Sequence, residues 1–182
     1  MLEGIVFVVV TLLLALVSRA SLRKPDSHGF YRFFAWESML GLFVLNMRVW
    51  YVDTNAPHQI ISGLLFFASL LLVLFGIALL QRSGKPDTKR NDAPMLEFEK
   101  TTALVTTGIY RYIRHPIYGS LFLLCCGFFF KNPSLTGSIL VVVASSFLVA
   151  AARVEEAENI RYFGEAYREY MKRSKMFVPF IL

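Results

Sequence analysis

Two groups of polar side chains in the C-terminal half of this chain have the types and the spacing to bind a ligand. One is Arg114-His115, followed directly by Pro116, and the other is the pair Glu155-Glu156. A proline restricts the residue before it and interrupts a helix, so Arg114 and His115 are expected on a fixed turn, with Pro116 beginning the next helix. Arginine and histidine can bind an anionic group, and histidine or glutamate can accept a proton.

Each of these residues also has a plain structural interpretation. An arginine at a helix boundary often extends to the membrane surface as an anchor, and a histidine before a proline is often structural. Glu155 and Glu156 are expected to open a helix, where the helix dipole favours acidic residues. Taken alone, the residues leave both interpretations open.

Long apolar segments position these groups. The chain has 182 residues, of which 55% are hydrophobic and 18% charged, and its mean hydropathy is +0.52. This composition excludes a disordered chain and a disulfide-stabilised secreted module. The expected fold class is all-α, a multi-pass transmembrane helical protein with about five spans, at 2–18, 31–52, 60–80, 117–130 and 135–152. Because a bilayer requires roughly 17–20 apolar residues per helix, the last two segments could form a hairpin that barely crosses.

The distribution of lysine and arginine predicts how the spans are oriented. Of the 19 such residues, three lie between the first and second spans and a fourth, Arg32, at the start of the second, seven lie between the third and fourth, and six after the fifth. Only Arg48 and Lys131 remain, each near the opposite face. Cytoplasmic loops carry the excess of positive charge, so we expect the N-terminus outside and the C-terminus in the cytoplasm. The first segment is expected to be a retained span of a bacterial inner membrane or a eukaryotic endoplasmic reticulum.

The expected organisation has three parts: N-terminal transmembrane helices in 1–80, a cytoplasmic connecting loop in 81–103, and a C-terminal half in 104–182. Within that half, 153–173 has apolar and aromatic residues at three- and four-residue steps, with acidic residues weighted to its start and basic ones to its end. This pattern predicts an amphipathic cytoplasmic helix. Gly164 is expected to mark a bend, and the helix would lie on the membrane or cap a cleft.

Two motifs in this half resemble those of a known family. Residues 114–118 read RHPIY, and the pair Glu155-Glu156 precedes FGEAY at 163–167. An RHPxY core followed by a Glu-Glu pair and FGxxY resembles the isoprenylcysteine carboxyl methyltransferases and the related phospholipid methyltransferases. The resemblance covers about residues 104–180, and the first three spans match in number and placement only. It implies an integral-membrane enzyme that uses S-adenosylmethionine, with the cofactor between the last two helices and the C-terminal segment.

The resemblance also implies roles for individual residues. The cofactor-binding residues it implies are Arg114, His115, Pro116, Tyr118, Glu155, Glu156, Phe163 and Tyr167, and the catalytic residues are Arg153 and Glu156. The cations and Tyr118 suit the cofactor carboxylate, a glutamate suits the ribose, and an aromatic ring suits the adenine. The family usually carries an arginine a few residues before the Glu-Glu pair, where this chain has Ala151 and Ala152. Arg153 would fill that role with a shifted helix phase, or the acceptor is not an anion.

The expected partners are membrane lipids and a lipophilic small-molecule or prenylated substrate, with no nucleic acid and no metal. A carboxylate acceptor needs no general base, whereas a thiol, amine or phenol would lose its proton to His115 or a glutamate. The sequence leaves this choice open. The alternatives are a non-catalytic membrane scaffold with the same fold and, further off, a nicotinamide-dependent membrane reductase.

Several other polar residues carry expectations of their own. Glu37, inside the second span, is expected to line the same cavity or to pair with Arg32 or Arg153. The others are expected not to bind a ligand: His28 and His58 as loop residues without partners, Tyr110 and Tyr112 at the membrane interface, and Cys125 and Cys126 as small apolar filler.

Overall fold

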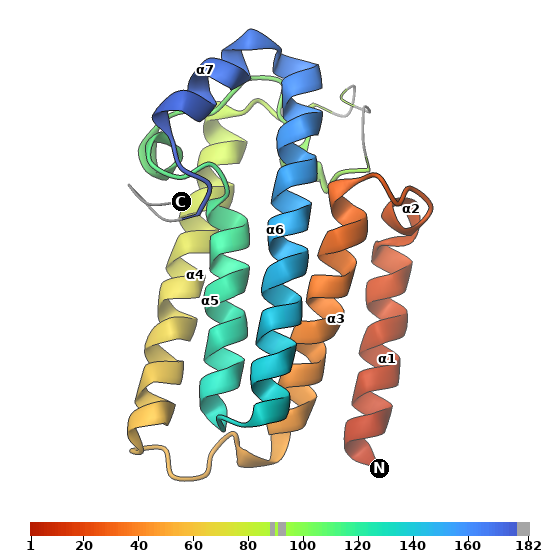
Figure 1. Ribbon diagram of the computed structural model, residues 1–182, viewed down its shortest axis with the longest axis vertical. Coiled ribbons are helices and arrows are strands. Elements are labelled where there is room, and N and C mark those ends of the chain that lie inside the picture. Colours follow the sequence, from red (N-terminus) through yellow and green to blue (C-terminus); the bar gives the residue numbers. More distant parts are fainter. Residues whose placement is uncertain (88–89, 91–93, 178–182) are drawn as a thin grey trace.

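The computed structural model describes residues 1–87, 90 and 94–177, and in these ranges the chain is helical and has no β-strand. The α-helices are α1 (Leu2–Val17), α2 (Arg19–Leu22), α3 (His28–Asn46), α4 (Pro57–Ser83), α5 (Pro116–Lys131), α6 (Leu135–Phe163) and α7 (Glu165–Arg173). Three 3-10 helices lie in the connections: η1 (Met47–Val49), η2 (Glu97–Glu99) and η3 (Gly108–Arg111). Figure 1 shows the five long helices side by side, with α7 across one end of the bundle. The predicted all-α class is therefore confirmed.

Local sequence sets where several helices begin and end. Pro57 and Pro116 occupy the first turn of α4 and α5, where the missing N–H has no helical partner to lose. The Ser134 side chain accepts a hydrogen bond from the Gly137 N–H at 3.1 Å and caps the start of α6. Gly164 ends α6 with φ +62° and ψ −136°, a conformation that favours glycine.

The long helices alternate in direction and pack around small side chains. α4 packs mainly against α5, and α3 mainly against α6. Two buried clusters join α3, α5 and α6: Ala35, Tyr118, Leu148, Ala151 and Ala152 form one, and Met39, Leu42, Cys125 and Ala144 form the other. Gly127 permits a close approach of α5 to α4, because a Cβ there would lie 2.5 Å from the Phe66 ring. Small residues at helix contacts are typical of helices packed within a membrane.

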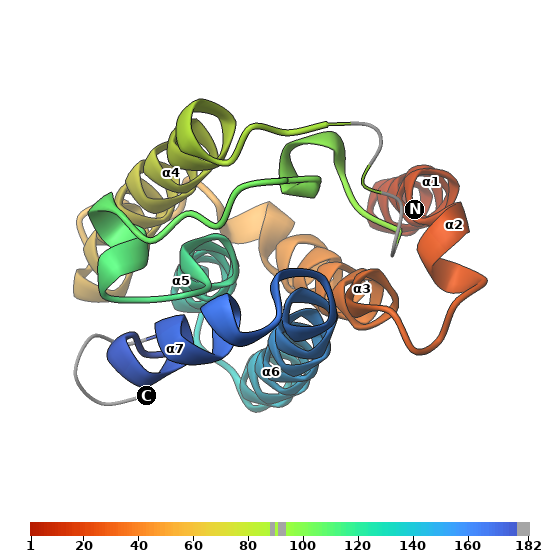
Figure 2. The same ribbon diagram turned by 90° about the horizontal axis from the view of Figure 1, so that it is seen from above.

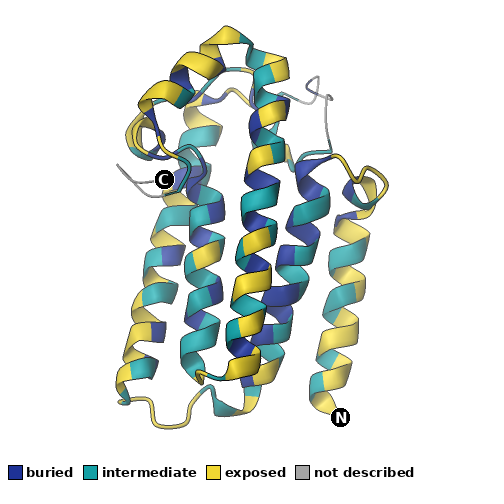
Figure 3. Ribbon diagram, viewed as in Figure 1, coloured by how far each residue is buried: buried dark blue, intermediate teal, exposed yellow. Residues whose placement is uncertain are grey.

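Much of the outer surface is apolar. Figure 3 shows exposed residues along the outer faces of α1, α4 and α6, and many of them are large hydrophobic side chains. By length and composition, α4 and α6 can each cross a membrane, whereas α1 and α5 are apolar but only 16 residues long. Such a surface is unfavourable in water and suits a lipid environment. Two spans are thus supported, and the count of five stays a prediction.

The alternation of the helices gathers the basic segments at one end. The described parts of the connections (18–27, 84–87, 90 and 94–115) and of the segment after α6 (164–177) all lie at the end where α7 lies (Figure 1). Arg48, in η1, and Lys131, at the end of α5, lie at the other end. The bundle therefore has the one-sided distribution of charge that the sequence predicted.

The second predicted span is placed wrongly. Instead of covering 31–52, the helix α3 begins at His28 and ends at Asn46, where η1 takes over. The Asn46 side-chain amide donates to the Phe128 carbonyl at 2.8 Å, so the polar residue at this end ties α3 to α5.

The amphipathic helix expected over 153–173 does not begin at residue 153, although the bend expected at Gly164 is confirmed. α6 continues unbroken to Phe163, and α7 is a separate helix after the bend at Gly164. The helix continues because 153–163 is rich in strong helix formers, so the first effective stop is the glycine. Glu155 and Glu156 thus lie inside α6 instead of opening a helix, and the dipole does not account for them.

Candidate active site

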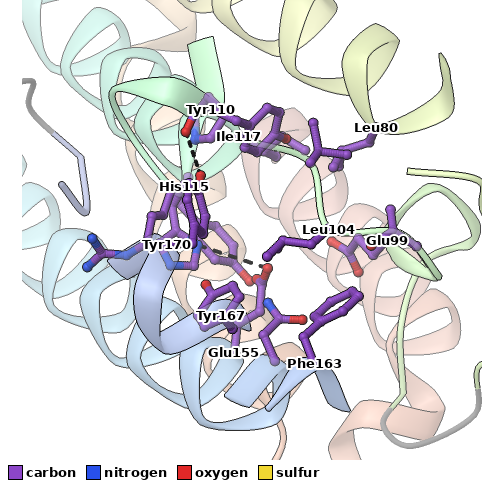
Figure 4. A pocket seen from close by; sticks show the side chains of 16 residues that line it. Leu80, Glu99, Leu104, Tyr110, His115, Ile117, Glu155, Phe163, Tyr167 and Tyr170 are labelled. Atoms are coloured by element: carbon purple, nitrogen blue, oxygen red, sulfur yellow. Dashed lines mark hydrogen bonds and ion pairs between the residues drawn. The ribbon is translucent and has the colours of Figure 1, made fainter. Parts of the chain in front are cut away.

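Seen from above, α4, α5, α6 and α7 come together with the connection that includes 99–105 at one end of the bundle (Figure 2). Residues of these elements line a cavity there (Figure 4). The space inside it, with the open mouth counted, is about 630 Å³. Its walls contain Leu80, Leu104, Val105, Pro116 and Ile117, the aromatic residues Tyr110, Tyr118, Phe163, Tyr167 and Tyr170, and the polar residues Glu99, Thr101, Arg114, His115, Glu155 and Asn159. Seven of the predicted site residues are in this wall, and Arg153 and Glu156 are not.

The turn that carries Arg114 and His115 is fixed by the C-terminal segment. The backbone N–H of Arg114 donates to the Lys175 carbonyl at 2.8 Å, and that of His115 donates to the Met176 carbonyl at 3.1 Å. The backbone N–H of Lys175 donates in turn to the Tyr112 carbonyl at 2.9 Å. The fixed turn predicted from His115-Pro116 is confirmed, but the tail after α7 holds it as much as the proline does.

Arg114 forms hydrogen bonds that connect three segments around the cavity. Its Nε donates to Glu156 Oε1 at 2.6 Å, and Nη1 donates to the carbonyls of Ser174 and, at 3.4 Å, Met171. Both side chains of the Arg114–Glu156 pair are largely buried. The pair therefore connects the start of α5 to α6 and to the end of α7, and Glu156 is occupied by this contact.

His115 and Tyr118 present polar atoms that no protein group satisfies. Both residues are buried, with exposed fractions of 4% and 3%, and their rings stack at 5.6 Å. His115 Nε2 is 3.4 Å from Glu156 Oε1, but the orientation is not that of a hydrogen bond, and the Tyr118 hydroxyl makes no hydrogen bond of standard geometry. Buried polar atoms without partners are uncommon and cost free energy, so both favour a bound polar ligand.

Glu155 is the glutamate of the pair that reaches the cavity (Figure 4). Its side chain is 25% exposed, and its Oε1 is 4.0 Å from His115 Nδ1. The sequence analysis placed both glutamates at the cofactor, favoured Glu156 for the wall and gave Glu156 the catalytic role. The structure brings Glu155 into the wall and keeps Glu156 behind it.

Aromatic side chains from the α6–α7 corner form one wall. Phe163 and Tyr167 are nearly parallel, with ring centroids 6.5 Å apart, and Tyr170 meets Tyr167 edge to face. The Tyr170 hydroxyl donates to the Tyr110 carbonyl at 2.6 Å, which joins α7 to η3. Burial raises the pKa of Tyr167, Tyr170 and Tyr110, so all three remain neutral phenols at physiological pH.

The opposite wall is held by a buried polar cluster that joins distant segments. Glu99 accepts hydrogen bonds from Arg32 Nη1 and, at 2.9 Å, from the Leu96 N–H. His28 lies 3.5 Å from Glu99 and bonds Glu158 of α6 at 2.5 Å. Burial disfavours the charged form of Glu99, but Arg32 and His28 outweigh it and hold its pKa well below the usual range.

Several expectations for other residues are wrong. His28 is 1% exposed and has two glutamate partners, instead of being a free loop residue. Tyr110 is buried in the cavity wall instead of lying at the membrane interface. Glu37 neither lines the cavity nor pairs with an arginine, because it accepts a hydrogen bond from Thr11 of α1 at 2.8 Å. Arg153 is exposed and lies away from the residues that the structure brings together.

Comparison with known proteins identifies the family. The profile of the phospholipid methyltransferase family matches residues 59–166, more than half of the chain. The chain belongs to this family. The match runs from α4 into α7 and so covers nearly all of the cavity wall. With two helices suited to crossing a bilayer, membership identifies a membrane protein.

Two individual methyltransferases are similar to parts of this chain. A methanethiol S-methyltransferase of Crocosphaera subtropica is 27% identical over 165 residues, which cover 87% of this chain and 63% of the relative. Protein-S-isoprenylcysteine O-methyltransferase of Rattus norvegicus is 33% identical over 124 residues, covering 63% of this chain and 41% of the relative. This chain thus spans less than two thirds of the length of both relatives. No solved structure matches it significantly. The resemblance seen in the sequence motifs is confirmed.

Proposed function

We propose that this chain is an S-adenosylmethionine-dependent methyltransferase that modifies a lipophilic acceptor at a membrane. The observation that carries the proposal is the pair of buried, unpartnered polar atoms in the cavity wall, His115 Nε2 and the Tyr118 hydroxyl. A non-catalytic scaffold gains nothing from leaving two polar atoms unsatisfied, whereas a ligand-binding site uses them. The family and both relatives are methyltransferases, which favours the methyl donor as that ligand over a nicotinamide cofactor.

The wall offers a fitting partner for each part of this cofactor. S-adenosylmethionine supplies a methyl group bonded to a positively charged sulfonium sulfur. His115 and Tyr118 are suited to donate hydrogen bonds to its carboxylate, and Glu155 is suited to balance positive charge. Phe163 and Tyr167 offer flat apolar surface to the adenine. Arg114, whose Nε and Nη1 already donate to protein acceptors, would keep the wall in shape.

Methyl transfer is an in-line displacement, so the contribution expected of the protein is to orient the reactants and to exclude water. The hydrogen-bonded turn at Arg114 is suited to orient the reactants, and α7, which covers the end of the cavity, is suited to exclude water. The relatives are named for a methanethiol and for a protein isoprenylcysteine as acceptors. Leu80, Leu104 and Ile117 give the cavity an apolar side for an acceptor of either kind (Figure 4).

The test is calorimetric titration of S-adenosylmethionine into the full chain in detergent, with Tyr118→Phe as the main variant. This substitution removes a hydroxyl that has no partner in the protein, so the ligand-free melting temperature is expected to stay the same or rise. Loss of one hydrogen bond should weaken binding roughly 2- to 12-fold. His115→Ala is expected to weaken it further, and the control His58→Ala, at the other end of the bundle, to leave it unchanged. No binding to the folded wild-type chain would refute the proposal.

We also propose that α1, α3, α4, α5 and α6 all cross the membrane, with the N-terminus outside and the cavity on the cytoplasmic side. The support is the alternation of the helices together with the basic segments at the cavity end. An enzymatic reporter fused to each terminus tests this, since only the C-terminal fusion should be active in the cytoplasm. Equal cytoplasmic activity of both fusions would refute it.

A further inference from the structure

A second cavity lies between the corner that joins α1 to α2 and the first half of α3. The space inside it, with the open mouth counted, is about 330 Å³. Its wall includes Val17 and Ser18 from the end of α1, Ser21 from α2, Arg32 and Trp36 from α3, and Leu96 from the connection after α4. The residues in its wall are not those that line the cavity at His115, so it is a separate space.

Arg32 brings an unsatisfied donor to this wall. The residue is 5% exposed, its Nη1 donates to Glu99, and its guanidinium carbon lies 5.1 Å from the centre of the Trp36 ring. Its Nε is buried and has no hydrogen-bond partner. Arg32 also interacts electrostatically with Tyr118 and Glu155, but the cavity that it lines is the second one. A buried donor without a partner costs free energy, so Nε favours a bound ligand with an acceptor oxygen.

Two serine hydroxyls lie in the same wall, on a corner that is held in place. Ser18 and Ser21 are both buried. The Ser27 hydroxyl donates to the Lys24 carbonyl at 2.7 Å, and a Cβ added to Gly29 at the start of α3 would clash with Ser21 Oγ. Hydroxyl and guanidinium donors that converge on one space suit the oxygens of a compact anion, because hydrogen bonds to a charged group are the strong ones.

The surface around this corner is basic. Arg19, Arg23 and Lys24 are exposed, and the only acidic residue in 18–27 is Asp26. Because Glu99 already balances the charge of Arg32, the excess positive charge near the cavity comes from these three side chains. Basic pockets at the ends of membrane helices bind the phosphate groups of lipids. The charge of the corner therefore favours an anionic ligand.

An apolar surface begins at the mouth of the cavity. Val17, in the wall, is 64% exposed, and Leu13 and Leu16 are also exposed on α1. If a lipid phosphate occupied the cavity, its chains would cover this surface of α1. A soluble phosphate compound would use the hydrogen-bond donors alone. Both ligands share the phosphate group, and they differ in whether the chains contribute to binding.

We propose that this second cavity binds a phosphate group, carried by a membrane phospholipid or by a soluble phosphate compound. Arg32 Nε and the hydroxyls of Ser18 and Ser21 donate hydrogen bonds to its oxygens. This site goes beyond the proposed function, since it shares no wall residue with the cavity at His115. Failure to bind phosphate would leave the proposed function standing wherever S-adenosylmethionine binding is measured.

The test uses Trp36 as a fluorescent reporter in the wall of the cavity. The chain has two tryptophans, so Trp50→Phe leaves Trp36 as the single one. Titrating this full chain in detergent with dioctanoyl phosphatidylglycerol should change the fluorescence of Trp36 and reach saturation. Dioctanoylglycerol, with the same chains and no phosphate, should produce no such change.

Inorganic phosphate is the arm that separates the two sources. Saturation by inorganic phosphate at concentrations similar to those of the lipid identifies a soluble phosphate compound as the ligand. Saturation by phosphatidylglycerol alone identifies a phospholipid. An equal response to dioctanoylglycerol, or no saturable response to either phosphate probe, would overturn the inference.

Two variants test the donors. Arg32→Lys keeps a positive charge opposite Glu99 but lacks the Nε–H, so phosphatidylglycerol should bind roughly 10-fold more weakly or worse. Because Arg32 is buried, the double variant Ser18→Ala/Ser21→Ala provides a second test that removes two hydroxyls and no charge. It should also weaken binding roughly 10-fold or more. Wild-type affinity in both variants would overturn the assignment.

Two controls locate the effect. Ser146→Ala makes the same change as the serine variant on an exposed part of α6 and should leave phosphatidylglycerol binding unchanged. Tyr118→Phe alters the cavity at His115 and should also leave it unchanged. Loss of phosphatidylglycerol binding in Tyr118→Phe would assign the ligand to that cavity and overturn the inference.

Discussion

Gly164 sets the corner between α6 and α7, and replacing it with alanine isolates the cost of its backbone conformation. Its φ of +62° and ψ of −136° fall in a region essentially restricted to glycine. An added Cβ would meet no atom within 4 Å, so the substitution introduces no clash. The whole cost is then backbone strain, about 1–3 kcal/mol. For a chain of this length we expect the melting temperature to fall on the order of 2–12 °C.

The matched control is Gly63→Ala in α4, where an added Cβ also meets no atom within 4 Å but the backbone is helical. Alanine is favoured over glycine in a helix by roughly 0.5–1 kcal/mol, so this variant should melt at or above the wild-type temperature. Thermal unfolding of both variants in one detergent provides the comparison. Because α7 carries Tyr167 and Tyr170, only Gly164→Ala should also bind S-adenosylmethionine more weakly. Equal melting temperatures for the two variants would refute the reasoning.

Three further changes test other contacts. Glu156→Gln leaves the buried Arg114 guanidinium without its carboxylate, and we expect thermal unfolding to show a loss of about 3–5 kcal/mol; a loss below about 1 kcal/mol would mean that the backbone acceptors suffice. Burial opposes the charge of His28, but hydrogen bonds to two glutamates outweigh it and raise its pKa to about 10. The resulting stability is complete below about pH 6.5 and is lost as the pH rises toward 10, so melting curves should show this decline in the wild type and not in His28→Gln. Gly127→Ala places a Cβ 2.5 Å from the Phe66 ring and should cost about 1–3 kcal/mol, and the added change Phe66→Leu should recover stability if the clash is the cause.

The sequence could not predict which of several neighbouring residues of α6 faces the cavity. Successive residues on a helix point about 100° apart, so Arg153, Glu155 and Glu156 face three different directions. Which of them meets the cavity depends on how α6 is rotated, and the burial of Ala151 and Ala152 against α3 and α5 fixes that rotation. The motif lies in the region that lines the cavity, but it could not tell the glutamate in the wall from the glutamate behind it.

The polar cluster behind the wall had no signal in the sequence. Glu99 is 67 residues from Arg32 in the chain, and Glu158 is 130 residues from His28. Nothing near His28 distinguishes it from an ordinary loop histidine. Its role follows from the packing of α3 against α6, which brings the start of one helix beside the far part of the other.

The sequence by itself determined the features that depend on neighbouring residues. Apolar length set the long helices, the proline at 116 set the start of α5, the glycine at 164 set the α7 corner, and the order of two motifs indicated the family. Tertiary structure alone decided the features that depend on distant residues. These are the position of Glu155 in the cavity wall with Glu156 behind it, the burial of His28 between two glutamates, and the partners of Arg32 and Arg114. Periodicity and backbone restriction act over a few residues, whereas helix rotation and burial arise only when segments from the whole chain pack together.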